Sequence, residues 1–173
     1  IYDEKICLLS VLKSYNTAHP DQLDEIWKIL KNAISNVICD IYTPYCVEPI
    51  LTFCSNSIRN GLLVDVLFTH LLPLYRNESL YLFSNKLTCL IIKIIDKDMD
   101  LQTETIHYLV KYFPYQCGQK QYLFISAITS IFEVTVGNDL KEIAPKLVNF
   151  LKIIIKSPNN KLAESAIKLL ISS

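Results

Sequence analysis

The sequence predicts an all-α fold in which antiparallel helix pairs stack one after another. Apolar residues recur at helical spacing along most of the chain, and glycine is scarce, with 3 among 173 residues. A sandwich or barrel needs many glycine-rich turns, so this composition disfavours both. The third observation is a period, because Pro73, Pro114 and Pro158 close successive helices about 40 residues apart.

The apolar stripes and their flanking residues predict the helices in order. The first, Leu23 to Ile41, starts behind His19-Pro20-Asp21, since proline suits a first helical turn and acids suit its positive end. The second runs from Tyr45 to Arg59 and is expected to end at Asn60-Gly61 in a left-handed cap. The remaining helices are expected at Leu62–Tyr75, Ser84–Lys97, Thr103–Phe113 with Thr103 as cap, Gln119–Thr135, Asp139–Lys156 and Asn159–Ile171.

The last six helices pair into three hairpins whose period is typical of HEAT and armadillo arrays. The predicted architecture is therefore a HEAT-like solenoid, a right-handed superhelix of antiparallel helix pairs. A single helical bundle is the alternative layout. In the solenoid, the residues expected to be buried are Leu90, Ile94, Leu109, Phe124, Ile128, Ile131, Leu147, Leu151 and Ile167.

Length and charge limit the classes of protein. The length suits one domain, residues 1–173, and because the chain begins at Ile1 we expect a fragment of a longer solenoid. With 17 basic and 17 acidic residues spread along the chain, nucleic-acid binding is not expected. The apolar runs are far shorter than the roughly 20 residues of a membrane-spanning helix, so no membrane association is expected.

The 6 cysteines predict no disulfide framework and no metal site. They form no CxxC pair and no Cys/His pair with zinc spacing. Most lie in apolar helical patterns, where a free thiol behaves as a small hydrophobe. We therefore expect buried, reduced cysteines and a cytoplasmic protein, with the nucleus also compatible. The residues concerned are Cys7, Cys39, Cys46, Cys54, Cys89 and Cys117.

One stretch suggests a metal site at first sight. Asp96, Asp98 and Asp100 alternate as calcium ligands do, but an EF-hand needs Gly at its sixth position and Glu at its twelfth. Those positions hold Leu101 and His107, so a solvated turn is the better interpretation. The chain also lacks HExxH, P-loop and nucleophile-elbow motifs. We expect no catalytic residue, no metal and no cofactor.

Tyrosines at the predicted helix ends are the candidates for partner contact. Interfaces are enriched in Tyr and Arg, although each tyrosine could instead complete the core with its hydroxyl in water. The sequence leaves both possibilities open. The predicted contact residues are Tyr75, Arg76, Glu78, Tyr115 and Lys120, of which the last four are expected to be exposed, and the period would place their two turns on one ridge.

Short segments from Leu71 onward resemble a known family. In chain order they are Leu71-Leu72-Pro73-Leu74, Ser79-Leu80, Lys97-Asp98, Leu109-Val110-Lys111-Tyr112-Phe113-Pro114, Phe132-Glu133-Val134, Ser157-Pro158 and Ala163-Glu164. In this order they resemble the C-terminal half of the B-prime (B56-type) regulatory subunits of protein phosphatase 2A.

The resemblance implies a pseudo-HEAT solenoid that binds the phosphatase scaffold and catalytic subunits and selects phosphoprotein substrates. A generic HEAT or armadillo adaptor is the alternative function. Members of the family also read a short Leu-x-x-Ile-x-Glu motif in a groove between middle repeats. The resemblance places Cys54 and Ile58 in that groove, with Ile58 at an apolar wall position and Cys54 where the family has Ile.

Overall fold

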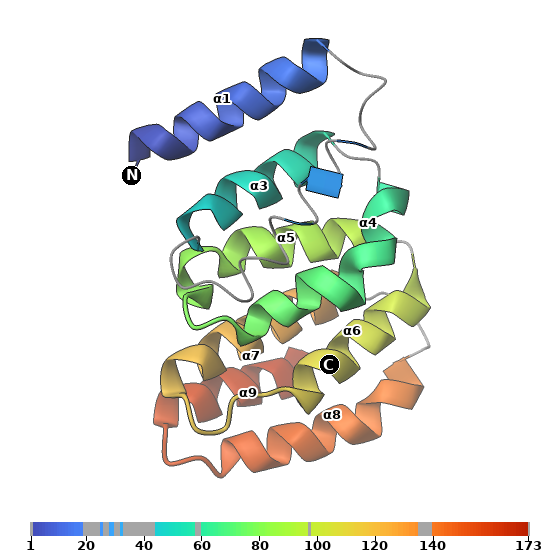
Figure 1. The fold of residues 1–173 in the computed structure, drawn as a ribbon. Helices are drawn as coiled ribbons and strands as arrows, with labels where there is room; N and C mark the ends of the chain where they lie inside the picture. The colour runs from blue at the N-terminus through green and yellow to red at the C-terminus, as the bar shows by residue number, and fades with distance from the viewer. Residues whose placement is uncertain are drawn as a thin grey trace. The chain divides into compact units, whose positions relative to one another are not determined.

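The computed structural model describes residues 2–18, 25, 28–29, 32, 44–57, 60–96, 98–134 and 140–172, which form helices and turns without a strand. None of the helices in these ranges is long and apolar enough to cross a membrane. The expected all-α, HEAT-like architecture is confirmed (Figure 1). The helices are α1 (Tyr2–Ala18), α3 (Pro44–Ser57), α4 (Asn60–Val66), α5 (Ser84–Ile95), α6 (Met99–Lys111), α7 (Gly118–Val134), α8 (Leu140–Ile155) and α9 (Asn160–Ser172).

Contacts within the chain group it into two compact units, Ile1–Ile94 and Ile95–Ser173. In the first unit, α1 packs against α3, although the sequence did not predict α1 because its apolar residues do not follow one stripe. The predicted helix from Leu23 to Ile41 lies largely outside the described residues. That the whole chain is one domain stays a prediction.

The start of α4 corrects one expected boundary. Asn60 and Gly61 were expected to end the preceding helix in a left-handed cap, but both lie in the first turn of α4. Helix α3 is described over Pro44–Ser57 and matches its prediction closely, while Ile58 and Arg59 lie outside the described residues. Glycine is compatible with an α-helical start as well as with a cap, so the local signal was ambiguous.

The predicted helix Leu62–Tyr75 is interrupted by Pro73. After α4 the backbone passes through a π-helical turn, Leu67–Leu71, and a 3-10 turn, Leu72–Arg76, in which Pro73 stands near the start. Proline has no N–H and clashes with the carbonyl four residues earlier, so it kinks or breaks a regular α-helix. The Leu72 N–H bonds instead to the carbonyl of Leu67, five residues back.

The second unit contains two stacked helix pairs. Helix α6 packs against α7 and α8 against α9, while α6 also contacts α8 and α7 contacts α9. First helices thus pack on first helices and second on second, which is the arrangement predicted for neighbouring HEAT-like repeats. The core between them is built from large apolar side chains, namely Ile106, Leu109, Phe113, Phe124, Ile128, Ile131, Leu147, Phe150, Leu151 and Ile154.

Eight of the nine residues predicted to be buried are buried, and Ile167 is not. Helix α9 buries the stripe Leu162, Ala166 and Leu169. Ile167 follows Ala166 and therefore points about 100° away from it around the helix axis. Its side chain is 41% exposed, so the prediction for this residue was wrong.

A glutamine in the first turn of α6 and another in the first turn of α7 hydrogen-bond the backbone of the turn that precedes each helix. Gln102 is the fourth residue of α6, and its amide donates to the carbonyls of Ile95 at 3.0 Å and Asp96 at 3.4 Å. Gln121 is the fourth residue of α7 and donates at the same spacing to Pro114 at 3.2 Å and Tyr115 at 2.8 Å. Each glutamine thus adds a side-chain donor to two carbonyls at the start of the turn, of which those of Ile95 and Pro114 also accept from the N–H groups of Asp98 and Cys117.

Asp98, and not Thr103, caps α6. Its carboxylate accepts a hydrogen bond from the Leu101 N–H at 3.0 Å, while Thr103 lies inside the helix. An aspartate before a helix is a common cap because its side chain accepts from an otherwise unpaired N–H. The expected cap at Thr103 was wrong by more than a turn.

Replacing each of the two glutamines by leucine tests how much these hydrogen bonds stabilise the fold. We expect Gln102→Leu to lower the free energy of unfolding by about 1–3 kcal/mol, because its carbonyl partners lose a buried donor. Gln121→Leu should cost less, since Gln121 is half-buried and water can replace its amide. The exposed Gln119→Leu is the matched control in urea unfolding. Equal stability of all three variants would contradict the role of the glutamines.

The cysteines depart from expectation. Cys54 is buried, but Cys7, Cys89 and Cys117 are exposed, so burial was wrong for three of the four cysteines whose side chains the structure describes. Cys89 lies on the solvent side of α5, between the buried Thr88 and Leu90, and Cys117 lies in the α6–α7 turn. The apolar character of a thiol does not fix its position when the neighbouring positions supply the core.

Candidate partner-binding surfaces

The turn that follows the 3-10 segment Leu72–Arg76 presents charged and aromatic side chains. The Asn77 side chain accepts from the Ser79 N–H at 2.8 Å, and the Asn77 N–H donates to the Leu74 carbonyl at 3.0 Å. Arg76 and Glu78 are exposed, as predicted. Tyr81, in the short 3-10 turn Leu80–Leu82, is 65% exposed and is an aromatic contact candidate that was not among the predicted contact residues.

Tyr75 does not belong to this surface, so its assignment as a contact residue is corrected. Its side chain is fully buried, and its hydroxyl lies 2.7 Å from the Thr88 hydroxyl on α5. The Thr88 hydroxyl donates to the Ser84 carbonyl at 2.9 Å, so Tyr75 is the donor in the pair. Burial raises the pKa of the Tyr75 hydroxyl.

The α6–α7 turn presents Tyr115. This side chain is 54% exposed and makes an edge contact with the ring of Phe113, with centroids 5.1 Å apart. The amide of Gln121 holds the Tyr115 carbonyl, which fixes the backbone of the turn. Lys120 is half-buried and so less open than predicted. That the turns at Arg76 and at Tyr115 form one ridge stays a prediction.

Tyr122 ties the α6–α7 turn to the α8–α9 turn. Its hydroxyl donates to the Asn159 side-chain oxygen, which also accepts from the Leu162 N–H at 3.4 Å as the cap of α9. The Tyr122 ring is half-buried and its hydroxyl is hydrogen-bonded. Tyr122 therefore completes the core, which is one of the two roles that the sequence allowed for the tyrosines at helix ends.

The residues predicted for a short-motif groove are not presented to a partner as far as the structure describes them. The Cys54 side chain is fully buried, and burial raises the pKa of its thiol to about 12. Its neighbour Phe53 is fully buried as well. Cys54 therefore packs in the core of its unit and cannot line an open groove, which corrects the prediction. Ile58 lies outside the described residues.

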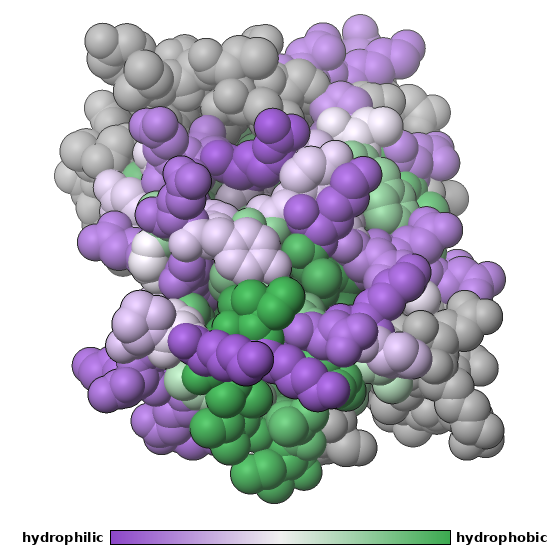
Figure 2. All heavy atoms as spheres, turned by 90° about the horizontal axis from the view of Figure 1, so that it is seen from below, coloured by the Kyte–Doolittle hydropathy of each residue, from purple (hydrophilic) through white to green (hydrophobic). Residues whose placement is uncertain are grey.

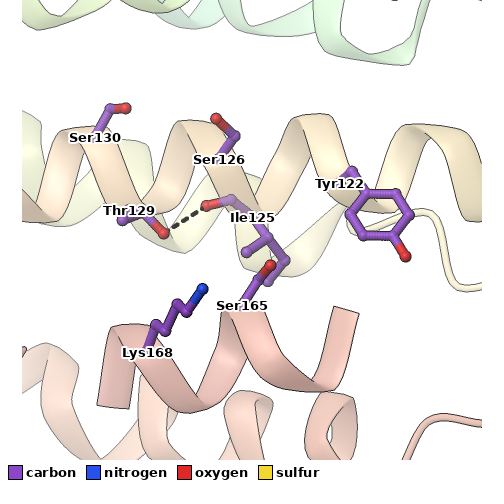
Figure 3. A pocket seen from close by; sticks show the side chains of 7 residues that line it. All are labelled: Tyr122, Ile125, Ser126, Thr129, Ser130, Ser165 and Lys168. Carbon is purple, nitrogen blue, oxygen red and sulfur yellow. Dashed lines mark hydrogen bonds between the residues drawn. The ribbon is translucent and has the colours of Figure 1, made fainter. Parts of the chain in front are cut away.

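A groove of about 370 Å³ runs between α7 and α9 (Figure 3). Its polar groups are largely engaged within their own helices, because Thr129 donates to the Ile125 carbonyl and Ser165 to the Lys161 carbonyl. The Lys168 ammonium lies 2.9 Å from Glu164, whose pKa it lowers through a hydrogen bond and its charge. The groove is lined by Tyr122, Ile125, Ser126, Thr129, Ser130, Ser165 and Lys168.

The aspartates near the start of α6 have a structural role. Asp98 caps the helix, and Asp96 and Asp100 are exposed around it. Across the part of the chain that the structure describes, no group of three or more His, Cys, Asp or Glu side chains could hold a metal ion.

The outer side of the last helix pair carries exposed apolar side chains. Figure 2, which views the molecule from below, shows apolar atoms gathered together with hydrophilic side chains around and across them. The large apolar residues exposed on α8 and α9 are Ile153, Ile167, Leu170 and Ile171. In stacked-repeat proteins such faces are buried by neighbouring elements.

The fold and surfaces define a helical-repeat protein whose exposed turns carry charged and aromatic side chains. The sequence matches the B56 family, described as protein phosphatase 2A regulatory B subunit, over residues 2–173, and the chain belongs to this family. The expected resemblance is thereby confirmed.

Curated relatives agree with this assignment. The chain is 32% identical over 118 residues to the phosphatase 2A 56 kDa regulatory subunit delta 2 isoform of Schizosaccharomyces pombe, covering 64% of this chain and 19% of that protein. It is 27% identical over 118 residues to regulatory subunit pptr-1 of Caenorhabditis elegans and 28% to the human beta isoform, again over 64% of this chain. It spans 22% and 24% of those two proteins, so it corresponds to about a quarter of its relatives or less.

Proposed function

We propose that this chain acts as part of a non-catalytic regulatory subunit of protein phosphatase 2A, which binds the scaffold and catalytic subunits and directs them to phosphoprotein substrates. The observation that carries the proposal is the family match over residues 2–173. The stacked pairs α6–α7 and α8–α9 support it, because such arrays bury their helix faces and leave turns for partners. The proposed location is the cytoplasm, with a nuclear pool.

The proposed contact residues lie on the two turns described above. Arg76 and Glu78 lie on one turn, and Tyr115 and Lys120 lie on the other. Single charges at the rim of an interface contribute little, whereas an aromatic or arginine anchor can contribute about 2 kcal/mol or more. We expect Arg76 and Tyr115 to carry most of the affinity.

Binding of the purified chain to the phosphatase scaffold–catalytic pair tests the proposal. The wild-type chain should capture both subunits, and the combined variant Arg76→Ala, Glu78→Ala, Tyr115→Ala and Lys120→Ala should lose about 2 kcal/mol or more of binding free energy. The control variant replaces exposed residues elsewhere, Asn85, Lys86, Glu104 and Lys146, by alanine. Circular dichroism checks folding. Failure of the wild-type chain to bind would refute the proposal, and equal affinity of both variants would place the contact elsewhere.

The same preparations test the non-catalytic role. The chain alone should release no phosphate from a phosphopeptide, with or without added divalent metal, since its described residues offer no cluster of metal ligands for such chemistry. Metal-dependent release by the chain without the catalytic subunit would contradict this part of the proposal.

A further inference from the structure

Several charged side chains of the second unit lie at opposite ends of the α6–α7 pair. The carboxylates Asp96, Asp98, Asp100 and Glu104 lie at the start of α6, and Glu133 lies at the end of α7. Because α6 and α7 form an antiparallel hairpin, the start of α6 and the end of α7 lie at the same end of the pair. That end of the pair is therefore acidic.

The opposite end is basic. Lys111 is the last residue of α6, Lys120 lies in the first turn of α7, Lys156 directly follows α8 and Lys161 lies in the first turn of α9. The sequence holds no Asp or Glu from Thr105 to Phe132, nor from Ile143 to Ala163, and Glu164 in the second turn of α9 is paired with Lys168. Neither of the two turns that carry these lysines therefore contributes a carboxylate.

Direct contacts hold the two turns side by side. The Tyr122 hydroxyl donates to the Asn159 side chain, and the rings of Phe113 and Phe150 lie 4.9 Å apart. Figure 1 shows the α6–α7 and α8–α9 turns on the same side of the helix stack α6–α9. We call this surface the basic edge, and it comprises Lys111, Lys120, Lys156 and Lys161 with the tyrosines Tyr112 and Tyr115.

The basic edge also carries two exposed aromatic rings. Lys111, Lys156 and Lys161 are exposed, and Tyr112 and Tyr115 are 37% and 54% exposed. The Lys111 ammonium lies 5.3 Å from the centroid of the Tyr112 ring. Tyrosine supplies apolar contact area at a low cost in conformational entropy, while the ammonium groups attract anions.

We propose that the basic edge binds an acidic, carboxylate-rich segment of a partner protein. The inference deepens the proposed function, on which it rests for the nature of the partner. Charge complementarity carries it, because four lysines lie at two adjoining turns that contribute no carboxylate. A nucleic acid fits less well, since the chain as a whole has a formal charge of zero and the lysines form a short edge and no long stripe.

A fluorescein-labelled octaglutamate peptide tests the basic edge directly. Its binding to the purified chain is measured by fluorescence anisotropy at low ionic strength, without phosphatase subunits. Replacing Lys111, Lys120, Lys156 and Lys161 together by Gln should weaken binding about tenfold or more. The control variant replaces the exposed Lys13, Lys28, Lys86 and Lys146 by Gln and changes the net charge equally. It should bind within about twofold of the wild type, and circular dichroism should show both variants folded.

Two results would overturn the inference. Equal weakening in both variants would mean that octaglutamate responds only to net charge. Tighter binding of a labelled oligothymidylate through the same four lysines would assign the edge to nucleic acid. If octaglutamate fails to bind while the chain still captures the scaffold–catalytic pair, the inference falls and the proposed function stands. Octaglutamate binding without capture of that pair supports the basic edge and refutes the proposed function.

Discussion

Phe113→Ala is expected to destabilise the second unit by about 3–5 kcal/mol, which is the range for removing a buried aromatic ring. The Phe113 ring is 5% exposed and meets three other rings edge-on. Its centroid lies 4.9 Å from that of Phe150, 6.0 Å from that of Phe124 and 5.1 Å from that of Tyr115. The ring thus joins α7, α8 and the α6–α7 turn, and no single neighbour can fill the space that alanine would leave.

Urea unfolding combined with hydrogen exchange measures this effect. Exchange should accelerate in α6, α7 and α8, where the contacts of Phe113 lie. Tyr115→Ala is the matched control, because it removes an exposed ring from the same cluster and should cost less than about 1 kcal/mol. A loss below about 1 kcal/mol for Phe113→Ala would show that the two helix pairs are not held together through this ring.

Tyr75→Ala should cost a similar amount, about 3–5 kcal/mol, in the first unit. Tyr75 is fully buried, and its hydroxyl donates to Thr88 on α5. Tyr75→Phe keeps the ring and removes the hydroxyl with its hydrogen bond to Thr88, so its cost should be about 1 kcal/mol. The difference between the two variants separates packing of the ring from the polar contact, and chemical denaturation measures both.

The same variants decide whether Tyr75 has any role at a surface. Tyr75→Phe keeps the buried ring and should leave phosphatase binding unchanged. Tyr81→Ala removes an exposed ring from the adjoining turn and should leave stability nearly unchanged. Weaker partner binding by folded Tyr75→Phe would contradict the buried role that the structure gives this tyrosine.

Helices α5 to α9 could be predicted from the sequence because their signals are local. The apolar stripe of each helix repeats every three or four residues, and Pro114 and Pro158 remove a donor at the point where a helix ends. Helix α1 escaped prediction because its apolar residues do not form a stripe. Pro73 correctly indicated the end of a helix. The sequence did not indicate the π-helical and 3-10 turns around Pro73, because these depend on which carbonyls the backbone N–H groups bond to.

The candidate site was predictable only in part. A tyrosine beside charged residues looks the same in the sequence whether it lies in the core or at an interface. Tyr75 is buried with its hydroxyl hydrogen-bonded to Thr88, thirteen residues away. Tyr115 is exposed on a turn whose backbone Gln121 holds, and its ring meets the edge of Phe113. The sequence could not decide between these outcomes.

The sequence by itself determined the family, the all-α repeat fold and most of the helices, since these depend on periodicity and on the order of short segments. Only the tertiary structure decided that Tyr75 and Cys54 are buried, that Ile167 is exposed and that the α6–α7 and α8–α9 turns lie side by side. The physical reason is that burial and the meeting of polar groups are set by contacts between residues far apart in the chain, such as Tyr122 with Asn159. Helical periodicity fixes which side chains share a face, but it does not fix what that face meets.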